Sequence, residues 1–174
     1  MPRNLELKAH YLSAQLAERT ARRLGARYKG SLQQRDTYFH ITFGRLKLRE
    51  TNRSRFELIY YQRPNKKSGR YSDFTIVLLP SAQAMKQVCT ALFGKDVVVH
   101  KTRRLYLFRN ARIHIDMVRG LGAFLEFEVL VTKGKRQAQA LLAELIDVFK
   151  IPRRSFVGVS YSDLLRKKRT TVRK

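Results

Sequence analysis

Residues 122–131 read GAFLEFEVLV and place two glutamates inside an otherwise apolar run. Successive side chains of a strand point to opposite faces, so Glu126 and Glu128 share one face, while Leu125 and Phe127 lie on the other. Two carboxylates at this spacing repel each other unless a cation lies between them. The pair therefore indicates either a solvent-exposed face or a site that binds a cation.

The length of 174 residues fits one domain with a core, which we predict over residues 1–165. No run approaches the roughly 18 apolar residues of a membrane span, and the start, MPRNLELKAH, lacks the apolar part of a signal peptide. We therefore expect a cytoplasmic protein without a membrane partner. Cys89 is the only cysteine, which excludes an intramolecular disulfide and a zinc site built from cysteines.

The charge is strongly unbalanced, with 37 basic and 13 acidic residues and a formal net charge of +24. The electrostatic field of such a positive charge attracts polyanions, among them nucleic acid, nucleotides and polyphosphate. A composition bias that serves solubility is the alternative. The last stretch, RKKRTTVRK at 166–174, is predicted to be a disordered basic tail.

Short alternating runs separated by turn residues predict strands. The predicted strands are 3–11, 34–41, 45–50, 55–63, 72–79, 97–108, 112–118 and 124–131. Helical patterns follow Ser13 and Ser81, each a candidate N-cap, and a third helix is predicted over 136–149. A short last helix is predicted to begin in SYSDLL, at 160–165. The chain is therefore expected to be mainly β, with flanking α-helices.

Most of these strands carry one apolar face and one face of mixed charge. The residues on the charged faces are Asn4, Glu6, Lys8, Arg45, Lys47, Arg49, Glu57, Arg63, Lys101, Arg103, Arg112, His114, Asp116, Glu126 and Glu128. In a sandwich these faces would look out to solvent. In a barrel they would line the lumen, with helices covering the apolar outside. Most of the acid lies in strands and not in loops, and this favours the barrel.

A lumen of mixed charge has a direct chemical use. Carboxylates on one wall would hold Mg²⁺ or Mn²⁺, because these ions prefer oxygen ligands. Arginines and lysines on the other walls would hold phosphate oxygens. The sequence contains no GxxxxGK[ST] motif, so any triphosphate would be held by side chains and not by a glycine-rich loop.

Several stretches together resemble the CYTH domain, the family of triphosphate tunnel metalloenzymes, and its class IV adenylyl cyclase branch in particular. They are NLELK (4–8), DTYF (36–39), GRLKLRE (44–50), RIHIDMVRGLGAFLEFEV (112–129) and SYSDLL (160–165). The resemblance implies a closed eight-stranded antiparallel β barrel, the triphosphate tunnel, and metal-dependent chemistry on triphosphates.

The resemblance also assigns roles, position by position. The implied ligands of Mg²⁺ or Mn²⁺ are Glu6, Asp116, Glu126 and Glu128. The implied phosphate-binding residues are Lys8, Lys47, Arg49, Arg63, Arg103 and Arg112, of which Lys8 and Arg63 are also the candidate catalytic residues. Asn4 departs from the family signature, because it stands where a glutamate is usual and brings no charge. His114 is either a catalytic acid or base, or a hydrogen-bonded lining group.

Two reactions fit these residues, and composition does not separate them. A cyclase converts ATP to cyclic AMP and pyrophosphate, and the cyclase-like motifs favour it. A triphosphatase directs water at the terminal phosphorus of an organic or inorganic triphosphate, which asks less of the site because no sugar has to be positioned. The third hypothesis is a non-catalytic module that binds polyphosphate or RNA. The expected assembly is a monomer or a homodimer.

Overall fold

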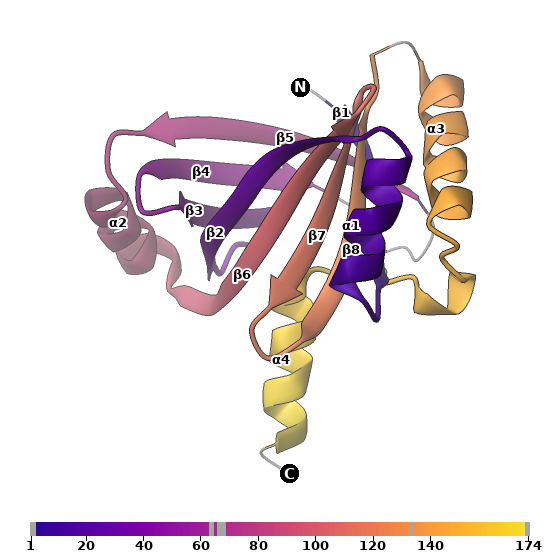
Figure 1. The fold of residues 1–174 in the computed structure, drawn as a ribbon. Helices are drawn as coiled ribbons and strands as arrows, with labels where there is room; N and C mark the ends of the chain where they lie inside the picture. Colours follow the sequence, from indigo (N-terminus) through magenta and orange to yellow (C-terminus); the bar gives the residue numbers. More distant parts are fainter. Residues whose placement is uncertain (1–2, 63–64, 66–68, 133, 173–174) are drawn as a thin grey trace.

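The computed structural model describes residues 3–62, 65, 69–132 and 134–172, and in this part of the chain eight antiparallel strands form a closed barrel (Figure 1). The order around the barrel is β1 (Arg3–His10), β5 (Arg70–Leu79), β4 (Arg55–Gln62), β3 (Arg45–Thr51), β2 (Arg27–Phe39), β6 (Lys95–Phe108), β7 (Ala111–Val118) and β8 (Gly122–Leu130). The predicted barrel is therefore confirmed and the sandwich is excluded.

Strand β1 closes the barrel, because it pairs with β8 on one side and with β5 on the other. Its register with β8 places Glu6 beside Glu128 and Lys8 beside Glu126. Its ladder with β5 is shorter and joins residues 3–6 to residues 70–73. The first and last strands of the sheet thus bring acids and a lysine together on the inner face.

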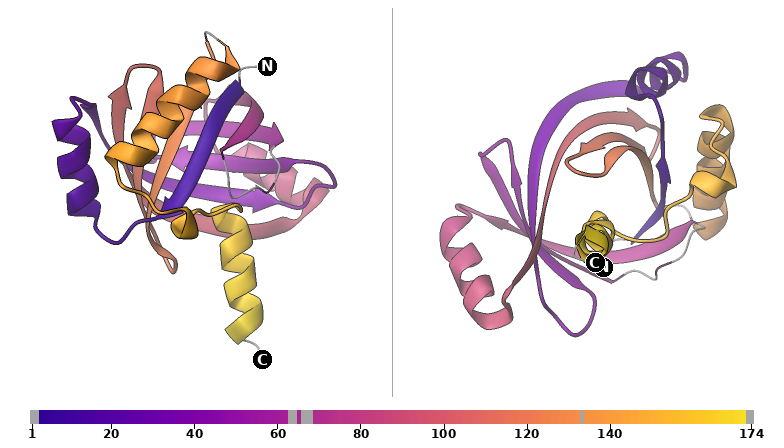
Figure 2. Two further views of the ribbon diagram at one scale, coloured as in Figure 1. Left: turned by 90° about the vertical axis from the view of Figure 1, so that its right-hand side faces the viewer. Right: turned by 90° about the horizontal axis from the view of Figure 1, so that it is seen from below.

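Helices α1 (Ala14–Arg23) and α3 (Lys135–Val148) pack on the outside of β1, β7 and β8 (Figures 1 and 2). The core between them contains Leu7, Ile113 and Phe127, all buried, and the ring of Phe127 lies 5.2 Å from that of Phe149. The apolar outer faces predicted from the alternation therefore pack against helices. Among the described residues, no helix has the length and apolar character needed to cross a membrane.

The helix ends agree with the predictions only in part. The Ser13 side chain accepts a hydrogen bond from the Leu16 amide, at 3.1 Å, and caps α1 as predicted. Helix α2 (Gln83–Phe93) is preceded by Ala82 and has no side-chain cap, so the predicted capping role of Ser81 is wrong. A short 3-10 helix, η1 (Arg153–Ser155), leads toward the last helix.

The largest differences from the predictions lie at β2 and at the C-terminus. Strand β2 begins at Arg27, seven residues before the predicted start, because it pairs with β6 from Arg27 onward although its first half is exposed. Helix α4 runs from Tyr161 to Val172. The segment predicted to be a disordered tail is therefore helical in its described part, and Arg166 holds it against the barrel by an ion pair with Asp96 at 2.8 Å. In the view from below, α4 stands end-on at the opening of the barrel (Figure 2).

Candidate active site

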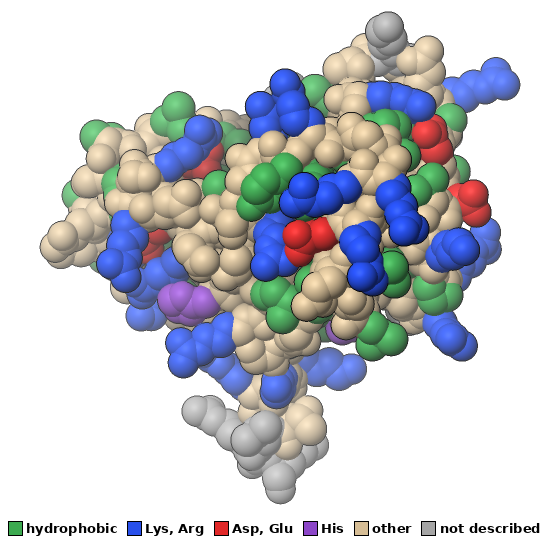
Figure 3. Space-filling view, in the orientation of Figure 1, with side chains coloured by type: hydrophobic (Ala, Val, Ile, Leu, Met, Phe, Trp, Pro, Cys, Tyr) green, Lys and Arg blue, Asp and Glu red, His purple; other side chains and the backbone are tan. Residues whose placement is uncertain are grey.

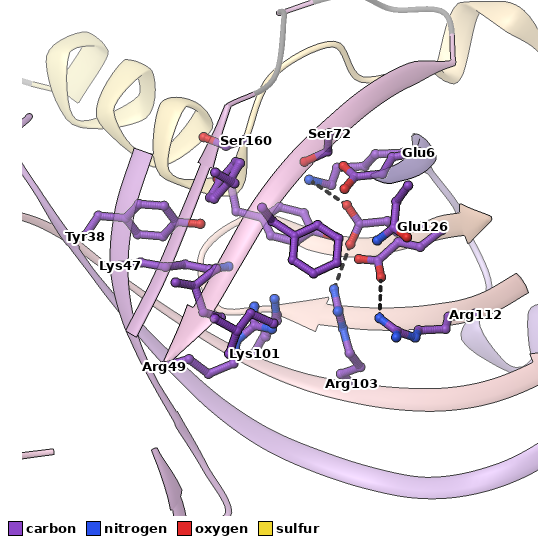
Figure 4. Close-up of a pocket in the computed structure, with 18 residues that line it drawn as sticks. Glu6, Tyr38, Lys47, Arg49, Ser72, Lys101, Arg103, Arg112, Glu126 and Ser160 are labelled. Carbon is purple, nitrogen blue, oxygen red and sulfur yellow. Dashed lines mark hydrogen bonds and ion pairs between the residues drawn. The ribbon is translucent and has the colours of Figure 1, made fainter. Parts of the chain in front are cut away.

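A cavity of about 130 Å³ lies inside the barrel, between two charged walls (Figure 4). Eight of the predicted site residues line it, namely Glu6, Lys8, Lys47, Arg49, Arg103, Arg112, Glu126 and Glu128. Asn4 and Lys101 line it as well. Arg63, predicted as a phosphate-binding and catalytic residue, lies outside the described residues.

The acidic wall contains a cluster that combines one imidazole with two carboxylates. Ligand atoms of His114, Glu126 and Glu128 all lie within 4.8 Å of one another. The Nδ1 atom of His114 lies 3.7 Å from the Glu126 carboxylate and 3.6 Å from that of Glu128. This nitrogen is buried and makes no hydrogen bond within the described part of the chain. A buried, unsatisfied nitrogen between two carboxylates fits a divalent cation, because all three groups can be ligands.

His114 was not among the predicted metal ligands, although its side chain was expected to point into the lumen. The cross-strand register explains its place, because His114 on β7 lies directly opposite Glu126 on β8. The sequence signal was the alternation in RIHID, which puts His114 on the same face as Arg112 and Asp116. That signal gave the direction of the side chain but not its neighbour on the next strand.

Glu126 lies between two cationic side chains of the acidic wall. Its carboxylate lies 3.2 Å from the Lys8 ammonium and 2.7 Å from the Arg103 guanidinium. Burial alone would raise the pKa of Glu126, but Lys8, His114 and Arg103 outweigh that effect and hold the pKa well below its ordinary value. Glu126 is therefore charged at neutral pH, as a metal ligand must be.

Asp116, which the resemblance assigns to the metal, is not part of this cluster. Both of its oxygens accept hydrogen bonds from Arg103, at 2.7 and 2.6 Å, and one also accepts the Tyr161 hydroxyl proton at 2.9 Å. Burial raises the pKa of Asp116, but Arg103 and Lys101 lower it to about 2. In the geometry shown here, Asp116 fixes the position of the Arg103 guanidinium, which in turn reaches Glu126.

The opposite wall is cationic and is centred on Asp36, the first residue of DTYF, which was not among the predicted site residues. Lys47 and Lys101 lie 3.0 and 3.6 Å from its carboxylate, and Arg49 donates two hydrogen bonds to it at 2.7 and 2.8 Å. Burial raises the pKa of Asp36, but Arg49 and the two lysines hold it well below its ordinary value. Asp36 was detectable in principle, because it shares a strand face with Tyr38, which lines the cavity.

Lys101 differs from the other cations of the site. Burial and the neighbouring Arg103 lower its pKa to about 7, although Asp36 acts in the opposite direction. Near neutral pH this lysine can therefore hold or release a proton, whereas the arginines beside it stay charged.

The first residue of helix α4 completes the site. The Tyr161 ring lies 3.8 Å from the Lys8 ammonium and 5.3 Å from that of Lys101, measured to the ring centroid. Its hydroxyl contacts Asp116 inside the barrel. Glu57, which was predicted on a charged strand face, is buried and pairs with Arg55 at 2.8 Å. It is not among the residues that line the cavity.

A family profile described as CYTH domain matches residues 2–156, which is most of the chain. The chain therefore belongs to the CYTH family, the triphosphate tunnel fold, as the resemblance predicted. No curated protein sequence matches the chain.

Solved structures with the same fold come from archaea, bacteria and a plant. The PH1012 protein of Pyrococcus horikoshii aligns with a TM-score of 0.84 at 20% identity, over 92% of this chain and 98% of that one. A candidate adenylate cyclase of Vibrio parahaemolyticus aligns with a TM-score of 0.75 at 17% identity, over 94% and 97%. A candidate adenylyl cyclase of Hippeastrum with a dominant triphosphatase activity aligns with a TM-score of 0.69 at 13% identity, over 97% and 96%. At these identities the likeness shows the fold alone.

Proposed function

We propose that the protein is a divalent-metal-dependent triphosphatase that hydrolyses the terminal phosphate of an organic or inorganic triphosphate inside the barrel. One observation carries the proposal: Glu126 and Glu128, the two carboxylates that cluster with His114, line one narrow cavity together with the cations Lys47, Arg49 and Lys101. A triphosphate needs both, because its charge has to be neutralised along its whole length.

The proposed division of labour follows from the chemistry of each wall. A bound Mg²⁺ or Mn²⁺ would supply Lewis-acid neutralisation of the phosphate oxygens. Arg49 and Arg103 are held by Asp36 and Asp116, so their guanidinium groups are already oriented before a phosphate arrives. Phosphoryl transfer passes through a loose transition state with charge on the equatorial oxygens, so fixed cations account for most of the catalysis proposed here.

The size of the cavity favours a compact group over a complete nucleotide. Its volume of about 130 Å³ is below the roughly 300 Å³ at which pockets for drug-sized ligands begin. The buried part of the substrate is therefore proposed to be the triphosphate itself. This supports hydrolysis ahead of cyclisation, because attack by water requires no ribose inside the barrel.

Adenylyl cyclase activity is the second candidate, and one feature of the cavity favours it. The same cavity is lined by apolar and aromatic side chains of β2, β4 and β5, whereas the acidic cluster lies on β7 and β8; these side chains are Tyr38, Ile59, Tyr61, Phe74 and Ile76. An apolar and aromatic lining of this kind suits the base of a nucleotide. Cyclisation would require the ribose 3′-oxygen to reach the α-phosphorus with this base in place.

Product analysis distinguishes the two reactions. The purified protein is incubated with ATP, and separately with tripolyphosphate, in the presence of Mg²⁺ or Mn²⁺. We expect orthophosphate with ADP or diphosphate, and loss of turnover on chelation. Glu126→Gln is expected to lower the rate by about 10²-fold or more, because a metal ligand and the partner of Lys8 lose their charge together. The matched control is Glu144→Gln, an exposed glutamate of α3 paired with Arg109.

Each other result has a defined meaning. Cyclic AMP and pyrophosphate, lost in Glu126→Gln, would replace the triphosphatase by the cyclase. No turnover of either compound, together with metal-independent binding, would replace both by the polyanion-binding module. An equal loss in the Glu144→Gln control would refute the assignment of catalysis to the acidic cluster.

A further inference from the structure

The outer surface of the barrel carries a second concentration of cations, on the side opposite to the cavity. Side chains of β6 alternate, so Arg103 points into the lumen while Arg104 lies on the outer face with Thr102 and His100. Figure 3 shows blue side chains surrounding an acidic group over α1 and the neighbouring strands. The tunnel chemistry described above uses none of these outer residues.

We define the basic band as Arg19 and Arg22 of α1, Arg35 of β2, Arg104 of β6, Arg119 after β7, and Lys168 of α4. From Tyr106 to His100 the outer face of β6 alone extends about 20 Å at roughly 3.3 Å per residue. The band continues onto α4, because the Lys168 ammonium donates a hydrogen bond to the Gly120 carbonyl at 2.7 Å. It therefore crosses the wall made by β2, β6 and β7 from one helix to another.

Much of the charge in this band is not neutralised by the protein. Within the described residues, no acid pairs with Arg19, Arg22 or Arg119, all of which are exposed. Arg35 has only a long contact of 3.8 Å with Glu50, and its side chain is 46% exposed. Arg104 is the exception, because it pairs with Glu18 of α1. The other arginines of the band are open to phosphates from outside.

An aromatic side chain lies at the α1 end of the basic band. Tyr28 is 43% exposed, its ring lies 5.0 Å from that of Tyr106, and the Arg22 guanidinium lies 6.0 Å from its centroid. Single-stranded nucleic acids are held by cations that follow the backbone and by aromatic rings on which bases stack. A plain polyphosphate would use the cations but not the ring.

At the other end, His100 is expected to be neutral. Burial, Arg35 and Arg119 all lower its pKa, and Glu50 raises it less. A neutral imidazole offers a flat surface and a hydrogen-bonding nitrogen between two arginines. Cations, one aromatic ring and one imidazole thus lie along the outer face of β6 and its neighbours.

From these observations we infer that the basic band binds a single-stranded nucleic acid on the outside of the barrel, independently of the tunnel. The site recognises the phosphate backbone chiefly through Arg19, Arg22, Arg35 and Arg119, and one or more bases through Tyr28. The inference does not rest on the proposed triphosphatase reaction, because no residue of the acidic cluster takes part.

The test measures binding of a fluorescein-labelled 12-nucleotide RNA without a 5′-triphosphate, by anisotropy, over a range of salt concentrations. The band variant is Arg19→Gln/Arg22→Gln/Arg119→Gln. The control variant, Arg136→Gln/Arg153→Gln/Arg154→Gln, removes three exposed arginines outside the band, so its net charge equals that of the band variant. Matching thermal unfolding of both variants shows that the fold is retained.

We expect the band variant to bind at least tenfold more weakly at 150 mM salt and its salt slope to fall by about 2, since each lost phosphate contact on a single strand removes roughly 0.7. The control variant should bind within about twofold of the unchanged protein. Equal losses in both variants would overturn the inference, because they would show a diffuse effect of net charge.

Tyr28→Leu separates nucleic acid from other polyanions. We expect it to weaken RNA binding by about tenfold and to leave the binding of a polyphosphate of similar length unchanged. Equal effects on the two ligands would overturn the assignment to nucleic acid. A loss of RNA binding in Lys47→Gln, a change inside the tunnel, as large as that in the band variant would overturn the separation of this surface from the tunnel.

Discussion

The two halves of the barrel differ in how their inner residues are supported. Behind the acidic cluster, β1, β7 and β8 pack against α1 and α3, and Phe127 and Ile113 are fully buried there. On the other side, the second half of β5 exposes Ile76, Val77 and Leu78 by 44%, 49% and 65%. The ladder between β1 and β5 is also short, since it ends at Asp73.

This difference shows that the denser packing lies behind the acidic cluster. Carboxylates that repel one another keep a useful geometry only when the strands that carry them are held by a dense core. The half of the barrel around β5 lines the part of the cavity that has apolar side chains. Apolar contacts of this kind tolerate small displacements. The comparison predicts that stability is concentrated behind the acidic cluster.

The largest expected effect comes from removing the core on the acidic side. Phe127→Ala should lower the free energy of unfolding by about 3–5 kcal/mol, because it leaves a cavity between β8 and α3. The paired change on the other half, Val77→Ala, should cost under about 0.5 kcal/mol, because its side chain is half exposed. Urea unfolding measures both, and similar costs would remove the distinction between the halves.

The second expected effect concerns Arg103, which joins the two acids of the acidic wall. Arg103→Met should lower the free energy of unfolding by about 3–5 kcal/mol, because the buried Asp116 and Glu126 lose a shared partner. The loss should shrink as the pH falls and the two carboxylates take up protons. Urea unfolding at several pH values tests this, and a cost independent of pH would contradict it.

A smaller effect is expected from Lys101 on the cationic wall. Its pKa is lowered to about 7 by burial, so above pH 7 the folded protein carries one proton fewer than the unfolded chain. Stability should therefore rise with pH from about 7, by at most about 1.4 kcal/mol per unit. Lys101→Met, which has no charge to lose, should not show this rise. Parallel stability curves for the two proteins would mean that Lys101 stays charged.

The smallest expected effect is at Tyr161, where α4 meets the site. Tyr161→Phe removes the hydroxyl that donates to Asp116 at 2.9 Å and should cost about 1–2 kcal/mol, since Arg103 still satisfies the carboxylate. The ring, and hence its contact with Lys8, is kept. Urea unfolding measures the cost, and an unchanged stability would show that this hydrogen bond is not part of what holds α4 in place.

The sequence predicted more of the acidic wall than of the cationic one. The alternation in β8 predicted the direction of Glu126 and Glu128, because one face of this strand carries the two acids and the other face is apolar. It did not give the neighbour relations between strands, so the contact of His114 with Glu126 and the grouping of cations around Asp36 were not predicted. These depend on the registers of β7 with β8 and of β2 with β3, which only the closed barrel fixes.

The start of β2 and the helical end of the chain were missed for a related reason. The first half of β2 is largely exposed, and its ladder with β6 shifts register between Tyr28 and Gly30, so the pairing leaves no regular periodic signal. The run of basic residues after Leu165 is typical of a solvated tail, but Arg166 is tied to Asp96, 70 residues earlier. Local composition does not reveal a partner so distant in sequence.

The pairing of β1 with β8 has a consequence for the order of events during synthesis. Lys8 leaves the ribosome well over a hundred residues before Glu126, its partner in the finished site. At a synthesis rate of about 5–20 residues per second, the edge of β1 that pairs with β8 stays open for at least several seconds. The charged positions on this strand, Glu6 and Lys8, also keep such an edge from pairing with other chains. The charges of Glu6 and Lys8 therefore disfavour pairing of the open β1 edge with other chains until β8 has been made.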